Sequence, residues 1–184
     1  MIDLGWLGHI EFTWHFLVAI LSITLIDLVL SRYGQHPCVA GFGIDIEWYQ
    51  QNQYFEGKAI SDEKAQTWSS QVRSYNQDYI LFLKHWLPEK MPPDYRQGLV
   101  FVDDSQKFIT LNEMAAEFEH WGNTFSPSPV AFQFGYKSDQ RWWEEYNDPP
   151  LEIGKLLLSR IPNLAGLFWV DFTAAELWPV PPSN

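Results

Sequence analysis

The chain has 184 residues, of which 46% are apolar and 19% are charged; this composition excludes a disordered protein and predicts one sizeable folded core. Its formal net charge of −11 disfavours nucleic acid as a partner, because binding to phosphate groups requires clustered Lys and Arg. Aromatic residues make up 17% of the chain. Their faces suit sugar rings, although for any one tryptophan a place in the core is the simpler interpretation.

Cysteine and histidine give no sign of a metal or redox centre. Cys38 is the one cysteine, which excludes an internal disulfide, and the five histidines are scattered without the spacing of a zinc motif. The glycines at 41–43 lack the further glycine and the following helix of a dinucleotide site. We therefore expect no metal and no cofactor.

The first predicted element is the strongly apolar segment 16–30. No Lys or Arg precedes it, no clear small-residue cleavage site marks it, and it contains Ser22, Thr24 and Asp27. These features disfavour an export signal or a membrane anchor, and they favour a buried helix that leads into the next strand. We expect no stable membrane insertion, and the sequence leaves the cellular compartment open.

A strand and a long helix are expected next. The run 39–47 is short and apolar and lies between Pro37 and a polar stretch, which is typical of a buried parallel strand. The segment 61–87 predicts a helix, with Ser61 as its N-cap, acidic residues in its first turn and Pro88 at its end.

The rest of the chain repeats this alternation. Strands are expected at 98–104, 129–136 and 165–172, and helices at 111–121 (ending at Gly122), 139–146 and 151–161. Strands and helices in this order require parallel strands joined by crossover helices, so the expected class is α/β. We expect a single domain over residues 1–184 with a loose tail at 179–184.

Polar or aromatic residues end every predicted strand. The carboxyl ends of parallel strands form one face, where (β/α)8 barrels hold their active sites and where open doubly wound sheets also bind ligands. Because no phosphate-binding loop is present, we favour the barrel. Asp103 and Asp104 end the second predicted strand, where they either line a cleft or are solvated.

The most informative of these strand ends carries Asp45 and Glu47. Residues two apart on a strand point to the same side, so the two carboxyl groups are expected to project together. Their mutual repulsion would raise the pKa of one and leave it a proton donor, as a general acid for glycoside cleavage requires. Alternatively, the two acids cap the strand or pair with Lys or Arg from neighbouring loops.

The stretch "GFGIDIEWY" resembles the fourth-strand motif DGxDxDxE of family 18 glycoside hydrolases, the chitinases and endo-N-acetylglucosaminidases. The resemblance places Glu47 on the catalytic acid, Asp45 on the aspartate beside it and Gly41 on the glycine, while Ala40 and Gly43 replace the two earlier aspartates. It implies a (β/α)8 barrel from the fourth strand onward. We therefore expect an incomplete barrel, which would expose strand edges and favour self-association.

Two further stretches agree with the resemblance. In "FQFGY", Tyr136 is similar to the tyrosine that holds the acetamido group of the substrate, and in "GLFWVDF", Trp169 is similar to the tryptophan beneath the sugar. The resemblance implies a substrate-assisted mechanism, in which Glu47 protonates the leaving oxygen and the acetamido oxygen attacks the anomeric carbon. Weaker candidates for contacts with the carbohydrate substrate are Gln133, Asp171, Trp48 and Tyr49.

Three other functions remain open from the sequence. A chitinase-like carbohydrate-binding protein would keep the aromatic cleft without turnover, although the retained Glu47 argues against it. A family 25 lysozyme-like enzyme also carries an Asp-x-Glu pair and cleaves peptidoglycan. A plain α/β domain would use the same acids structurally.

Overall fold

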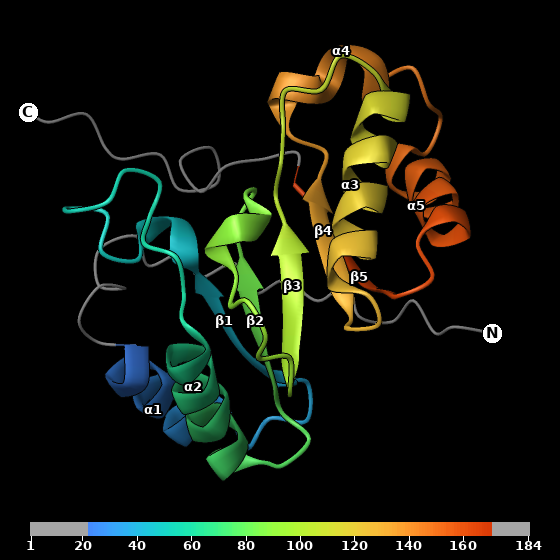
Figure 1. Cartoon of the computed structure of the whole chain (residues 1–184). Coiled ribbons are helices and arrows are strands. Elements are labelled where there is room, and N and C mark those ends of the chain that lie inside the picture. Colours follow the sequence, from blue (N-terminus) through green and yellow to red (C-terminus); the bar gives the residue numbers. More distant parts are fainter. Residues whose placement is uncertain (1–21, 171–184) are drawn as a thin grey trace, which may run out of the picture. The chain divides into compact units, whose positions relative to one another are not determined.

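The computed structural model describes residues 22–170 (Figure 1). The chain divides into two compact units, Met1–Phe101 and Val102–Asn184. The expectations for 16–21, for Asp171 and for a loose tail at 179–184 lie outside the described residues. The expectation of a single domain stays a prediction.

The first described element of the first unit is helix α1 (Ser22–Tyr33), which confirms the helix expected from the apolar segment over its described part. The elements that follow are strand β1 (Gly41–Asp45), the short helix η1 (Ile46–Trp48), helix α2 (Asp62–Tyr75), strand β2 (Ile80–Lys84) and the short helix η2 (Pro88–Lys90). Strands β1 and β2 pair in parallel, with Asp45 opposite Lys84. These two residues therefore lie side by side at the carboxyl ends of their strands.

Apolar side chains at helical spacing form the core beneath α1 and α2. Ile26 and Leu30 of α1 and Trp68 and Val72 of α2 are buried, each pair four residues apart on one helix face. Burial of one such side chain contributes about 1.5–3 kcal/mol. Asp27 of α1 also accepts hydrogen bonds from two side chains of α2, so polar contacts reinforce the packing of the two helices.

Helix α2 begins where the sequence predicts. The hydroxyl group of Ser61 accepts a hydrogen bond from the N–H of Lys64 at 3.3 Å, which satisfies one of the free N–H groups of the first turn. Asp62 accepts the N–H groups of Asp94 and Tyr95, at 2.9 and 2.6 Å. The start of α2 thus fixes a distant loop as well as itself.

The prediction of a helix over 61–87 is wrong beyond Tyr75. The Asn76 side chain accepts the N–H of Asp78 at 3.0 Å, and this local turn offers the backbone an alternative to further helix. Strand β2 follows, with alternating burial in which Leu81 and Leu83 are inside. The apolar residues of β2 could continue the buried face of a helix, but they form a short strand instead.

The second unit contains the other expected strands and helices. Its elements are strand β3 (Leu99–Asp103, which begins in the first unit), helix α3 (Leu111–Phe125), strand β4 (Val130–Phe134), the short helices η3 (Lys137–Asp139) and α4 (Gln140–Trp143), helix α5 (Pro149–Arg160) and strand β5 (Leu164–Trp169). Strands β4 and β5 pair in parallel, with Phe134 opposite Trp169. The strands predicted at 98–104 and 129–136 are confirmed with shorter bounds, and the strand predicted at 165–172 is confirmed over its described part, where it begins one residue earlier.

Helix α3 does not end at Gly122 as expected but continues through it to Phe125. A Cβ atom on Gly122 would lie 2.7 Å from Cγ2 of Ile161, which is too close for a real contact. The glycine is therefore required for close packing inside the helix rather than for ending it.

The fold class α/β is confirmed. The five strands are parallel, and neighbouring strands follow one another in chain order: β1, β2 and the start of β3 in the first unit, and the end of β3, β4 and β5 in the second. The order does not reverse, so the described strands lack the switch point of a doubly wound sheet. Within residues 22–170, no helix combines the length and apolar character needed to cross a membrane.

Candidate functional site

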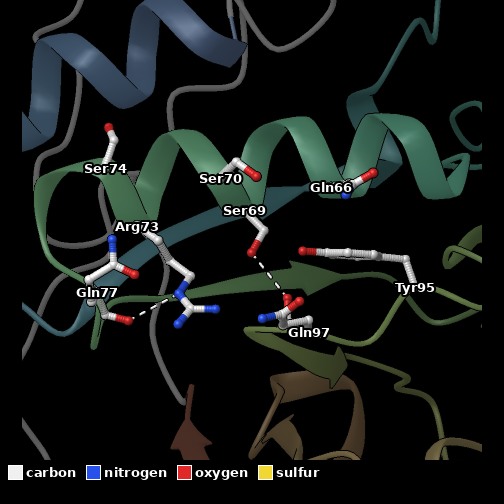
Figure 2. A pocket seen from close by; sticks show the side chains of 8 residues that line it. All are labelled: Gln66, Ser69, Ser70, Arg73, Ser74, Gln77, Tyr95 and Gln97. Carbon is white, nitrogen blue, oxygen red and sulfur yellow. Dashed lines mark hydrogen bonds between the residues drawn. The ribbon is translucent and has the colours of Figure 1, made fainter.

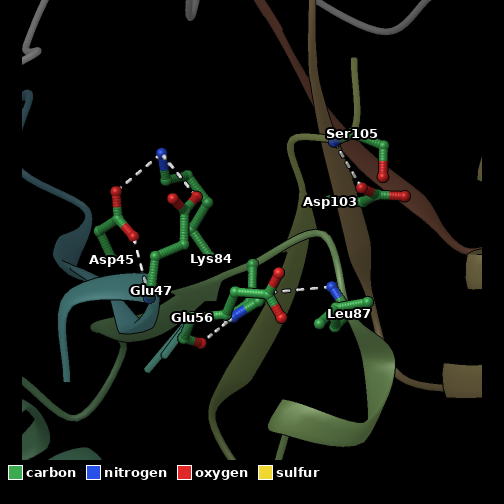
Figure 3. A network of polar contacts seen from close by, with 8 residues as sticks. Asp45, Glu47, Glu56, Lys84, Leu87, Asp103 and Ser105 are labelled. Carbon is green, nitrogen blue, oxygen red and sulfur yellow. Dashed lines mark hydrogen bonds and ion pairs between the residues drawn. The ribbon is translucent and has the colours of Figure 1, made fainter. Parts of the chain in front are cut away.

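The first unit gathers charged side chains at the carboxyl ends of its strands (Figure 3). The ammonium group of Lys84 lies 2.9 Å from Oδ2 of Asp45 and 3.9 Å from Oε1 of Glu47. The three side chains are partly buried, with 15% of Lys84 and 18% of each acid exposed. In this environment the positive charge offsets the repulsion between the two carboxylates.

The two carboxyl groups converge for a reason that differs from the expected one. Strand β1 ends at Asp45, and Glu47 lies in η1 rather than on the strand, so alternation along a strand does not align them. Asp45 is the N-cap of η1, and its Oδ1 atom accepts the N–H of Glu47 at 3.2 Å. This tight turn and the shared contact with Lys84 bring the side chains together. The alternative expectation, that the two acids pair with a Lys or Arg, thus has a specific partner in Lys84, which lies at the end of a strand and not in a loop.

The sequence did not point to Lys84 or to the neighbouring His85, because both fell within the helix predicted over 61–87. His85 is fully buried, and its Nδ1 atom accepts the N–H of Leu87 at 2.9 Å. The other ring nitrogen, Nε2, therefore carries the proton and donates to the carbonyl oxygen of Glu56, also at 2.9 Å. The imidazole thus joins the loop that carries Glu56 to the loop that carries Leu87. Alternating apolar residues before the Lys-His pair were the signal for a strand end here.

The aromatic residues after Glu47 differ in position. Tyr49 is buried, with 7% of its surface exposed, and its ring meets Trp68 edge to face at 5.4 Å. Burial also raises the pKa of its hydroxyl group. Tyr49 is therefore a core residue and not a contact along a cleft, whereas Trp48 is half-buried beside the acid pair.

In the second unit, Trp169 lies in an aromatic cluster at the ends of β4 and β5. Its ring lies 5.4 Å from that of Phe134 and 5.1 Å from that of Trp143, both in edge-on geometry. The indole N–H of Trp143 donates to the carbonyl oxygen of Tyr136 at 2.9 Å. Tyr136 and Trp169 thus belong to one local structure. Trp143, which the sequence did not single out, connects them.

Gly135 allows this cluster to form. Its φ is +88°, and a Cβ atom there would lie 2.6 Å from the Trp169 ring.

The two remaining predicted contacts are Gln133 and Asp171. Gln133, on β4, is half-buried. Asp171 lies outside the described residues.

The strand-end acids of the second unit are buried rather than solvated. Asp103 is 0% exposed and Asp104 is 6% exposed. Burial raises the pKa of Asp103 to about 8, although its Oδ1 atom accepts the N–H of Ser105 at 2.7 Å. Burial likewise raises the pKa of Asp139, the last residue of η3. Asp103 is therefore held largely without charge at neutral pH.

No group of three or more His, Cys, Asp or Glu side chains within residues 22–170 is placed to hold a metal ion. Comparisons with protein-family models, with curated proteins and with solved structures find no match to this chain. The resemblance to family 18 glycoside hydrolases therefore rests on the motif residues alone.

Proposed function

We propose that the protein is a glycoside hydrolase that cleaves carbohydrate containing N-acetylhexosamine, with Glu47 as the general acid. The observation that carries the proposal is the convergence of Asp45 and Glu47 at the carboxyl end of a parallel strand. Active sites of (β/α)8 barrels use this end of the strands. The proposal takes the parallel strands, which follow one another in chain order, as part of such a barrel.

The mechanism assigns each group one task. The carboxyl proton of Glu47 passes to the glycosidic oxygen as the bond to the anomeric carbon breaks, while the acetamido oxygen of the sugar attacks that carbon. Asp45 orients the acetamido group. Lys84 holds both side chains and stabilises the carboxylate that Glu47 becomes. Water then attacks the anomeric carbon and opens the ring formed by the acetamido group, while the Glu47 carboxylate takes up the proton of the water; no covalent bond to the enzyme and no cofactor is needed.

The deciding experiment measures hydrolysis of a fluorogenic chitobioside and of peptidoglycan by the wild type and by Glu47→Gln. The substitution keeps the shape of the side chain but removes the transferable proton, so the rate is expected to fall by at least about 100-fold. Glu89→Gln, at an exposed position in η2, is the matched control and should retain full activity. Activity that survives Glu47→Gln would exclude Glu47 as the acid. Cleavage of peptidoglycan alone would favour the family 25 lysozyme-like reaction.

A second candidate function is carbohydrate binding without turnover, as in an inactive chitinase-like protein. The ammonium group of Lys84 favours it, because an acid already engaged by a cation is less available as a proton donor. The proposed sugar-stacking residue is Trp169, whose ring is half-buried. Binding of chitin oligomers without hydrolysis, lost in Trp169→Ala and kept in Glu47→Gln, would support this function over the enzyme.

A further inference from the structure

A second polar site lies in the first unit, away from the residues assigned to catalysis. A pocket of about 360 Å³ opens beside α2, where one face of the helix meets the loop that carries Tyr95 and Gln97 (Figure 2). In Figure 2 the guanidinium group of Arg73, the side chain of Gln97 and the hydroxyl group of Tyr95 extend into the same space below the helix. All three belong to residues that line the pocket.

The charge of the pocket is unlike that of the chain. The chain has 23 acidic and 12 basic residues, yet Arg73 is the only charged residue that lines the pocket, and the others are Ser, Gln and Tyr. Clusters of neutral amides and hydroxyls around one cation are suited to an anion, and no carboxylate lines this pocket. The pocket is therefore a local exception to an acidic surface.

The guanidinium group of Arg73 is held in place through its Nε atom. Its Nε–H donates to the carbonyl oxygen of Gln77 at 3.0 Å, which fixes the plane of the guanidinium group. Within residues 22–170 its two terminal nitrogens form no hydrogen bond or ion pair. Two parallel N–H groups of this kind match the two oxygens of a carboxylate.

Close contacts hold the walls of the pocket together. The hydroxyl group of Ser69, which is fully buried, donates to the carbonyl oxygen of Gln97 at 3.1 Å. Gly98 has a φ of +69°, and a Cβ atom there would lie 2.9 Å from the Ser69 hydroxyl and 3.2 Å from Cδ of Arg73. The Asp62 carboxylate accepts a hydrogen bond from the backbone N–H of Tyr95, which also lines the pocket. The backbone that carries Gln97 and Tyr95, and the guanidinium group of Arg73, are thus held by contacts within the fold before any ligand arrives.

We propose that this pocket binds a hydroxylated carboxylate, the chemistry of an acidic sugar. The carboxylate pairs with the terminal nitrogens of Arg73, and the ligand hydroxyls exchange hydrogen bonds with Gln97 and Tyr95. A phosphate fits less well, because a single cation offsets only part of its charge. The site is independent of Glu47 and does not rest on the proposed hydrolase activity.

Calorimetric titration of the full chain with glucuronate, glucose and acetate tests the proposal. Glucuronate should bind with a Kd of about 1 mM or tighter, and both glucose and acetate at least about tenfold more weakly. Added salt should weaken glucuronate binding, since the carboxylate contact is ionic. Equal binding of glucose and glucuronate, or no binding of glucuronate at all, would overturn the proposal.

Variants locate the binding. Arg73→Gln should weaken glucuronate at least about tenfold, and Arg73→Lys should recover part of the loss, because it restores the charge without the paired N–H groups. Arg32→Gln, an exposed arginine of α1, is the control and should bind as the wild type does. Thermal unfolding checks that each variant is folded. If Arg73→Gln does not fold, Tyr95→Phe replaces it, and this variant should weaken glucuronate binding by a smaller factor. Unchanged affinity in Arg73→Gln contradicts the assignment, and Glu47→Gln should leave binding intact whether or not the protein is a hydrolase.

Discussion

The carboxyl group of Asp103 carries a burial cost that depends on pH. It is fully buried, its Oδ2 atom has no hydrogen-bond partner within residues 22–170, and burial raises its pKa from 3.8 to about 8. Between these two values the unfolded chain loses the proton while the folded chain keeps it. The unfolded state then binds fewer protons, so the free energy of unfolding falls as the pH rises from about 4 to 8.

Asp103→Asn should remove this pH dependence. The amide has nearly the same shape and carries no charge at any pH, so the variant is expected to gain roughly 5 kcal/mol in stability relative to the wild type between pH 4 and pH 8. At pH 4 the difference should vanish or reverse. Urea unfolding at the two pH values measures it, with Asp78→Asn, at an exposed position, as the control. Equal pH slopes in Asp103→Asn and the wild type would contradict a neutral buried Asp103.

Lys84 is expected to stabilise the first unit through the two acids. Lys84→Met keeps the length of the side chain but leaves Asp45 and Glu47 close together without their cation, and it should cost about 1–3 kcal/mol at pH 7. Asp45→Asn in the same background should cost less than it does alone. A double-mutant cycle from urea unfolding should give a coupling of about 1 kcal/mol. Additive effects would show that the contact contributes no net stability.

At the scale of elements, the pairing of β4 with β5 depends on Gly135. Gly135→Ala requires a positive φ in a residue that disfavours it and places a methyl group against Trp169, so a loss of about 2–4 kcal/mol is expected. Gly166→Ala in β5 is the matched control, because a Cβ there would have its nearest neighbour at an ordinary 3.4 Å. Thermal unfolding and the near-ultraviolet spectrum of the tryptophans measure the effect. Equal losses in the two variants would exclude a special role for the Gly135 conformation.

Elements with distinct ends could be predicted from the sequence, and those without could not. The strands β1, β3, β4 and β5 are apolar runs between Gly, Pro or polar residues, and each lies where expected. Strand β2 was missed because the turn before it at 76–78 contains neither Gly nor Pro. Its side-chain hydrogen bond is visible only in three dimensions.

The missed strand had consequences for the candidate site. Two acids at the end of β1 could be read from the residue pattern, but their cation could not, because Lys84 was assigned to a helix. Tyr49 was expected in a cleft, yet η1 turns the chain after Asp45, and the ring of Tyr49 packs against Trp68. Short helical turns after a strand change side-chain directions in ways that strand alternation does not describe.

At the scale of the whole molecule, two opposing effects set how stability varies with pH. The net charge of −11 and the buried Asp103 both favour acid conditions, since protonation reduces repulsion among the acids and matches the neutral form of Asp103. Asp62 acts in the other direction. The N–H groups of Tyr95 and Asp94 hold its pKa below the ordinary 3.8, so its stabilising contacts are complete above that value and are lost as the pH falls through the lowered pKa.

The free energy of unfolding should therefore be greatest at about pH 4, well below the neutral range, and should fall on both sides. Urea unfolding across the pH range measures the profile. Added salt screens the repulsion among exposed acids but acts weakly on a buried group, so the decline toward pH 8 should become shallower without disappearing. In Asp103→Asn with added salt, the decline should be nearly absent. Repulsion among the acids and the buried Asp103 each require the free energy of unfolding to fall before pH 7 is reached. A wild-type maximum at pH 7 or above would therefore contradict both.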